Sequence, residues 1–171
     1  MKKELTRRSF LKLAGVGTLA VAMSGSLTGC DVIDNLKDMD SVSAAIGDVK
    51  FMLSASAWVN NGSNGMSYQP TCEIRNNSKK AVTYGGIGSN CEVIITGVLT
   101  DKNGKEYPMT YAGENGSAPA GEKYEVKDFK LVAVGKGLYM EGSKVVTTFT
   151  YKGRKAVFTE YNDGNITSKV E

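Results

Sequence analysis

The three cysteines, Cys30, Cys72 and Cys91, are the residues of this chain with the most specific chemistry. A thiol can carry a lipid, join a disulfide, bind a metal or attack a substrate. The chain contains no histidine, so it lacks the commonest metal ligand and the commonest general base at neutral pH. We therefore predict no catalytic, cofactor-binding or metal-binding residue, and we do not expect an enzyme.

Cys72 and Cys91 leave two alternatives open. A disulfide between them would close a loop of about 20 residues and would stabilise the fold by roughly 3 kcal/mol on the chain-entropy model. The other alternative is two buried thiols in adjacent sheets. A redox motif is not expected, since no Cys-x-x-Cys is present.

The N-terminal segment contains a short basic motif followed by an uncharged run. Residues 6–12 read Thr-Arg-Arg-Ser-Phe-Leu-Lys, with Arg7, Arg8, Phe10 and Leu11 at the key positions. This stretch resembles the twin-arginine signal consensus, which implies export through the Tat translocase. The uncharged run that follows, residues 13–29, is diluted by glycine and serine. It is shorter than the ~20 apolar residues of a membrane span and is typical of a removable signal peptide.

The run ends in Leu27-Thr28-Gly29-Cys30, which resembles a bacterial lipobox. The resemblance implies that lipoprotein-processing enzymes acylate Cys30 and cut the chain before it. Each buried CH₂ contributes ~0.8 kcal/mol to membrane attachment, and a single acyl chain holds a protein only reversibly, so two or three chains are needed. We expect a mature protein anchored in the lipid bilayer through Cys30, on the extracytoplasmic face of a bacterial membrane.

The net charge of +3 belongs to the signal peptide. Residues 1–29 hold five basic side chains and one acidic side chain, which leaves 16 basic and 17 acidic side chains in the other 142 residues. A chain that is nearly neutral after cleavage, with scattered lysines, has no basic stripe for phosphates. We expect no nucleic-acid partner.

The chain divides into four segments by composition. We predict a signal peptide over residues 1–29, then the lipidated cysteine and an acidic tether over residues 30–48. The tether carries five aspartates and one lysine, and its apolar residues lie near heptad spacing, which favours a short amphipathic helix. A β-sandwich domain is predicted over residues 49–165, and a tail over residues 166–171.

From Val49 onward the apolar residues alternate with polar ones, as in half-buried strands. Turn signals recur every 8–12 residues, including Asn103-Gly104 and Lys152-Gly153, and Pro70 indicates an edge or a bulge. The predicted strands cover residues 49–58, 66–75, 81–84, 91–100, 106–111, 124–134, 145–151 and 156–161.

This spacing predicts an all-β, antiparallel sandwich of about seven to eight strands. The segment from Met66 to Met109 resembles the immunoglobulin-like domains of many small bacterial lipoproteins. The resemblance is one of pattern and implies no functional residues.

Three function classes remain compatible with the sequence. The first is a non-enzymatic, membrane-anchored module that binds an unknown protein or glycan. The second is a structural or assembly subunit of a larger cell-envelope complex, and the third is a small hydrolase that uses carboxylates. The eight tyrosines and Trp58 would supply a glycan-stacking surface if they were exposed.

Overall fold

The computed structural model describes residues 41–135, 138 and 141–171. This part of the chain is built from twelve β-strands and one short 3-10 helix, η1. In chain order the elements are β1 (Val42–Ile46), β2 (Val49–Asn60), η1 (Gly62–Asn64), β3 (Met66–Asn76), β4 (Val82–Gly85), β5 (Val93–Thr100), β6 (Glu106–Tyr111), β7 (Gly116–Ala118), β8 (Glu122–Val126), β9 (Leu131–Ala133), β10 (Lys144–Tyr151), β11 (Arg154–Tyr161) and β12 (Ile166–Val170).

All twelve strands belong to one sheet, whose main path runs β1-β2-β3-β9-β6-β5-β10-β11-β12. β8 pairs with β3, while β4 joins β5 and β7. Every pairing is antiparallel except that of β4 with β5. The all-β prediction is therefore confirmed. The predicted number of seven to eight strands was too low, because short strands add to the sheet at its ends and sides.

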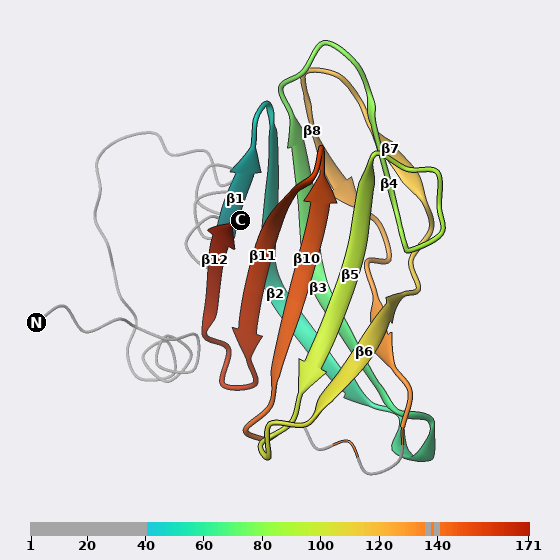
Figure 1. Ribbon diagram of the computed structural model, residues 1–171, viewed down its shortest axis with the longest axis vertical. Helices are drawn as coiled ribbons and strands as arrows, with labels where there is room; N and C mark the ends of the chain where they lie inside the picture. The colour runs from blue at the N-terminus through green and yellow to red at the C-terminus, as the bar shows by residue number, and fades with distance from the viewer. Residues whose placement is uncertain (1–40, 136–137, 139–140) are drawn as a thin grey trace, which may run out of the picture. The chain divides into compact units, whose positions relative to one another are not determined.

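The sheet folds over on itself into two layers (Figure 1). β1, β2 and β3 form one layer, and β5, β10, β11 and β12 form the other, while β9 links β3 to β6. The two ends of the path meet where the Ser168 hydroxyl donates a hydrogen bond of 2.9 Å to the Ser43 carbonyl. The curvature thus brings β12 beside β1 and nearly closes the sheet.

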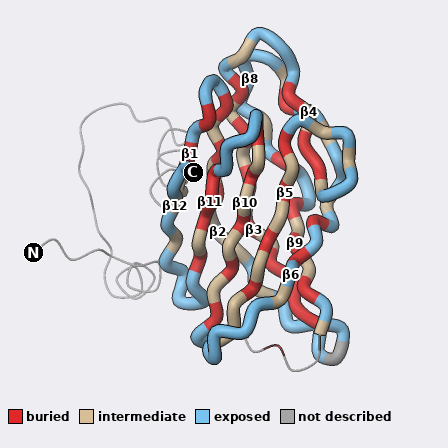
Figure 2. The backbone as a smooth tube through the Cα atoms, viewed as in Figure 1, coloured by how far each residue is buried: buried red, intermediate tan, exposed pale blue. Residues whose placement is uncertain are grey.

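Aromatic side chains fill the space between the layers. Phe51 on β2 stacks on Phe149 on β10, with ring centroids 4.8 Å apart. Phe149 also meets Phe158 edge-on at 5.6 Å. Buried and half-buried residues alternate along β5 and β10, as Figure 2 shows. This period of two follows from the alternation of side chains across a sheet.

Both predicted hairpins are present. Asn103-Gly104 lies in the turn between β5 and β6, where the Asp101 carboxyl group accepts hydrogen bonds from the backbone N–H groups of Asn103 (2.8 Å) and Lys105 (2.9 Å). The turn between β10 and β11 is Lys152-Gly153, with φ of 48° and 75°. Two consecutive positive φ values are the geometry of a type I′ turn, which matches the twist of the strands.

Two of the predicted domain boundaries are wrong. The tether was placed over residues 30–48, but Val42–Ile46 forms β1, with Ala44 and Ile46 buried. The tail was placed over residues 166–171, but Ile166–Val170 forms β12 along β11. In both cases an open strand edge determines the conformation of a short segment whose own pattern is weak.

The region from residue 112 to residue 134 also differs from its prediction. The expected loop contains β7, which pairs with β4. The expected strand over residues 124–134 is two strands, β8 and β9, which contact different parts of β3. Between them Asp128 has a φ of 53°, and this left-handed residue turns the chain.

Candidate functional site

A carboxyl group lies inside the apolar interior. β11 places Ala156, Phe158 and Glu160 on its inward side, and Glu160 is only 6% exposed. Removing a carboxyl group from water costs several kcal/mol unless hydrogen bonds replace the lost solvation. The neighbours of Glu160 therefore determine whether this position is tolerated.

Three side chains from the opposite layer donate hydrogen bonds to Glu160. The Tyr68 hydroxyl on β3 donates to Oε2 at 2.6 Å. The Ser56 hydroxyl on β2 donates to Oε1, and the Trp58 indole N–H lies 3.3 Å from the same oxygen and 3.1 Å from Ser56 Oγ. We call Ser56, Trp58, Tyr68 and Glu160 the Glu160 cluster.

A β-bulge in β2 makes this cluster possible. Before the bulge Val49, Phe51 and Leu53 are buried, so odd-numbered residues face the interior. The register of β2 against β3 then skips Ala55, and Ser56 and Trp58 stand opposite the buried residues Pro70 and Tyr68. An inserted residue moves the following side chains to the other face of a strand. Ser56 and Trp58 thus point inward, toward Glu160.

The predicted significance of Pro70 follows from the same geometry. β3 is not an edge strand, since it pairs with β2 on one side and with β9 and β8 on the other. Pro70 lies opposite the bulge and between the β9-paired and β8-paired parts of β3. A residue without an N–H fits a point where the ladder is interrupted.

The arrangement is suited to holding the layers together. Desolvation by burial, reinforced by the Glu160 carboxyl group, raises the pKa of Tyr68 well above its usual value, so its hydroxyl keeps its proton and remains a donor. Both oxygens of Glu160 accept hydrogen bonds, and the Ser56 hydroxyl is the donor to one of them. A hydroxyl and carboxyl pair used in this way acts as a cross-layer connection.

No local sequence pattern identifies the Glu160 cluster. Ser56 and Glu160 are 104 residues apart, and no motif connects them. One signal was available, because Glu160 continues the inward alternation of Ala156 and Phe158. A carboxyl group at an inward position of a strand predicts a buried partner.

Both described cysteines are free thiols. Cys72 is fully buried on β3, opposite Leu53 and Val126. Cys91 is partly exposed in the segment that leads into β5. The structure therefore has separate thiols, but the expectation that both are buried in adjacent sheets is wrong, because Cys91 is partly exposed and the strands form one sheet. Arg7, Arg8, Phe10, Leu11 and Cys30 lie outside the described residues.

Most described tyrosines are structural. Tyr68, Tyr84, Tyr111 and Tyr151 are buried, whereas Tyr161 is 43% exposed, and Trp58 is partly buried against the core. Burial raises the pKa of Tyr111 to about 12, and its hydroxyl donates a 3.0 Å hydrogen bond to the Glu114 carbonyl. Side chains held in this way cannot form the stacking surface that a glycan-binding site requires.

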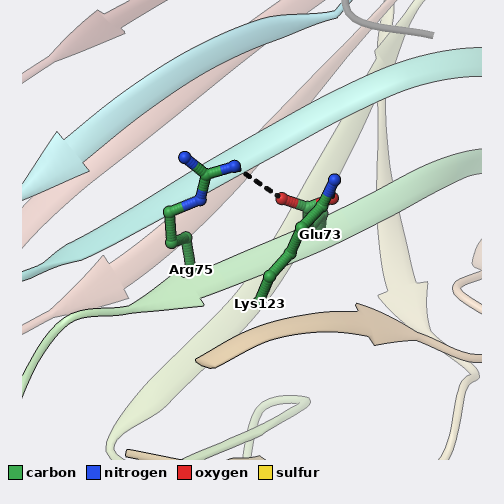
Figure 3. Close-up of polar contacts among 3 residues, drawn as sticks. All are labelled: Glu73, Arg75 and Lys123. Carbon is green, nitrogen blue, oxygen red and sulfur yellow. Dashed lines mark ion pairs between the residues drawn. The ribbon is translucent and has the colours of Figure 1, made fainter. Parts of the chain in front are cut away.

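The outer face of β3 and β8 carries an ion cluster (Figure 3). Glu73 stands directly opposite Glu125, and Arg75 opposite Lys123, so the direct pairs are like-charged. Two contacts between opposite charges offset the repulsion between these like charges. Lys123 Nζ lies 2.8 Å from Glu73 Oε2 across the strands, and Arg75 Nη2 lies 3.8 Å from Glu73 Oε1 along β3. The basic partners are solvent-exposed while Glu73 is largely buried, and ion pairs with such exposed partners contribute about 0–1 kcal/mol each.

Among residues 41–135, 138 and 141–171, no group of three or more cysteine, aspartate or glutamate side chains is placed to hold a metal ion. No helix within these same ranges is long and apolar enough to cross a membrane. Comparison with protein-family models, curated proteins and solved structures gives no match to this chain.

We expect Tyr68→Phe to lower the free energy of unfolding by about 1–3 kcal/mol, because it removes one hydrogen bond from a buried carboxyl group and leaves the ring in place. Urea denaturation measures this change. Tyr161→Phe is the matched control, since Tyr161 is exposed, and its effect should stay within about 0.5 kcal/mol. Equal effects of the two substitutions would contradict the assigned role of the cluster.

The two thiols should differ in reactivity. In the full chain carrying Cys30→Ala, we expect Cys91 to react with Ellman's reagent in the native state and Cys72 to react only after unfolding. Burial both shields the Cys72 thiol and raises its pKa, so it offers little thiolate. Adding Cys91→Ser should abolish the native-state reaction. A native protein that yields no thiol until a reductant is added would indicate a disulfide instead.

Proposed function

We propose that this chain is a membrane-anchored, extracytoplasmic lipoprotein whose β-domain is a non-enzymatic binding or interaction module. The observation that carries the proposal is the order of its parts. The twin-arginine motif with Arg7 and Arg8 comes first, a lipobox ending in Cys30 follows, and a β-domain begins by Val42. The first part would direct export, the second would provide the lipid anchor, and the β-domain would then be held at the membrane surface.

The distance between anchor and domain is short. Eleven residues, 31–41, separate Cys30 from the first strand. A fully extended chain spans at most ~3.3–3.6 Å per residue, so the spacer could reach no more than roughly 40 Å. A domain held so close to the bilayer would meet partners in the membrane or in the layer directly above it.

The chemistry of the domain favours binding over catalysis. The chain has no histidine, and a serine nucleophile then needs a carboxylate or lysine base that is free to take its proton. In the Glu160 cluster the carboxyl oxygens already accept hydrogen bonds from Tyr68, Ser56 and Trp58. A base occupied by three donors is poorly placed to activate Ser56.

The outer face of β5, β10 and β11 supports a protein partner. Its cross-strand rows consist largely of uncharged β-branched residues that are half-buried in the free domain: Thr96, Val98, Val146, Thr148 and Thr159. Depletion of charge is the compositional mark of the central part of protein interfaces. The same observation fits the second candidate function, a subunit of a larger cell-envelope complex.

In-cell crosslinking of the tagged full chain, followed by mass spectrometry, separates these two functions. Co-purification in fixed stoichiometry with the same proteins supports a structural subunit, and a partner captured in variable amounts supports an interaction module. Capture of nothing above the background of an untagged strain would remove the support for both.

We expect Cys30→Ala to release the protein from the membrane fraction or to leave the precursor unprocessed, because no acyl chains can be attached. Fractionation and immunoblotting measure both outcomes. Cys91→Ala is the matched control and should stay anchored, since its thiol lies in the β-domain. A Cys30→Ala protein that is processed and membrane-bound like the parent chain would exclude the lipobox.

Replacing Arg7 and Arg8 together with lysine keeps the charge and removes the paired guanidinium groups. We expect the precursor to accumulate in the cytoplasm, as detected by the unprocessed size in pulse-chase labelling. The control, Lys3→Arg, leaves the motif intact and should be exported at the parental rate. Normal export of the double variant would mean that the chain uses another route.

A further inference from the structure

Asparagine is followed directly by glycine at four places in the described part of the chain: Asn61-Gly62, Asn64-Gly65, Asn103-Gly104 and Asn115-Gly116. In such a pair the backbone nitrogen of the glycine can attack the carboxamide carbon of the asparagine, because glycine has no side chain to obstruct the approach. All four asparagine side chains are exposed. The backbone hydrogen bonds of the folded domain therefore decide which pair reacts.

Two of the glycine N–H groups are held by short hydrogen bonds. The Gly62 N–H donates to Asn60 Oδ1 at 2.8 Å, and the Gly104 N–H donates to the Asp101 carbonyl at 3.0 Å. The nitrogen attacks only after losing its proton, and a donated hydrogen bond stabilises the protonated form. These two pairs are therefore protected.

The Gly116 N–H is held by the pairing of β7 with β4, in which Gly116 stands opposite Tyr84. The Thr83 N–H lies 3.3 Å from Glu92 Oε2, in the segment that leads into β5, so Thr83 faces β5 and not β7. Hydrogen-bonding direction alternates along a strand. Tyr84 then faces β7, and the Gly116 N–H donates to its carbonyl group.

The Gly65 N–H is held less tightly than the other three. The described part of the chain offers it only the Gly62 carbonyl, at 3.5 Å, whereas N–H···O hydrogen bonds in proteins measure about 2.7–3.2 Å. Gly65 itself is well placed, with a φ of 108° and a carbonyl group that accepts a 2.9 Å hydrogen bond from the Asn61 N–H. Its nitrogen is therefore fixed beside the exposed Asn64 side chain without a short hydrogen bond of its own.

We propose that Asn64 is a site of spontaneous deamidation in the folded domain. The Gly65 nitrogen gives its proton to solvent and attacks Cγ of Asn64, so that a C–N bond forms and the side-chain nitrogen leaves as ammonia. Water then opens the five-membered succinimide ring at one of its two carbonyl groups and yields aspartate or isoaspartate. One water is consumed, one ammonia is released, and no group is oxidised or reduced.

The modification changes the turn between β2 and β3. Both products carry a carboxyl group in place of a neutral carboxamide, and isoaspartate also adds one carbon to the main chain between residues 64 and 65. Gly65 cannot shift toward β9, because even a Cβ added to it would collide with the Ala133 carbonyl oxygen. We expect η1 to absorb the added length. This inference does not rest on the proposed function, because it needs neither the anchor nor a partner.

Timed incubation of the full chain tests the site. The protein is purified in detergent, kept folded at mildly alkaline pH and sampled over several days. Samples are digested at acidic pH, and mass spectrometry locates each asparagine that has become an acid. We expect Asn64 to convert about fivefold faster than Asn61, Asn103 and Asn115, a ratio that corresponds to one net hydrogen bond.

The same incubation in concentrated urea is the control for the fold. Unfolding frees all four glycine N–H groups, so we expect the four rates to converge. A folded chain in which another Asn-Gly pair converts as fast as Asn64 would overturn the proposal. So would an equal preference for Asn64 in urea, since the fold would then not be its cause.

A pair of variants tests the same site through the product. Isoaspartate is labelled in the aged, folded protein with an isoaspartate-specific methyltransferase. Asn64→Gln should remove most of the label, because the corresponding attack on glutamine must close a six-membered ring and is far slower. Asn103→Gln is the matched control and should keep nearly all of it. Labelling that survives Asn64→Gln would refute the assignment.

Discussion

The arrangement of the two layers depends on the hydrogen bonds that the buried carboxyl group of Glu160 accepts. It lies on β11 in one layer, and its donors Tyr68, Ser56 and Trp58 lie on β3 and β2 in the other. Apolar packing such as that of Phe51 on Phe149 drives the layers together but tolerates sliding, since the hydrophobic effect is not directional. A buried acceptor that needs particular donors fixes the register between the layers.

The bulge in β2 is the backbone feature that satisfies this requirement. Without the skipped residue, Ser56 and Trp58 would face outward and Glu160 would lose two of its three donors. The same bulge lies beside Pro70, where β3 lies between its β9-paired and β8-paired parts. One irregularity therefore supports a buried polar cluster and accommodates a proline in an inner strand.

The proposed function separates along the chain in a similar way. In this proposal, export and anchoring would depend on short linear motifs that other proteins recognise before and during translocation. Under the proposal, binding would depend on a surface that exists only in the folded domain, the outer face of β5, β10 and β11, whose half-buried residues are largely uncharged. The polar side chains of the two clusters already contact one another: Tyr68 donates a hydrogen bond to Glu160 inside the domain, and Lys123 pairs with Glu73 on its outer face.

Local sequence patterns are enough to predict the fold class and most of the strands. Alternating apolar residues and turn signals such as Asn103-Gly104 are local, and local geometry suffices to interpret them. Residues 42–46 and 166–170 become strands only through tertiary contacts, because each segment needs the edge of a neighbouring strand to pair with. The tertiary structure alone also brought Ser56 to Glu160, 104 residues away. A bulge reverses which residues face the interior, and a strict period of two cannot reveal where that reversal occurs.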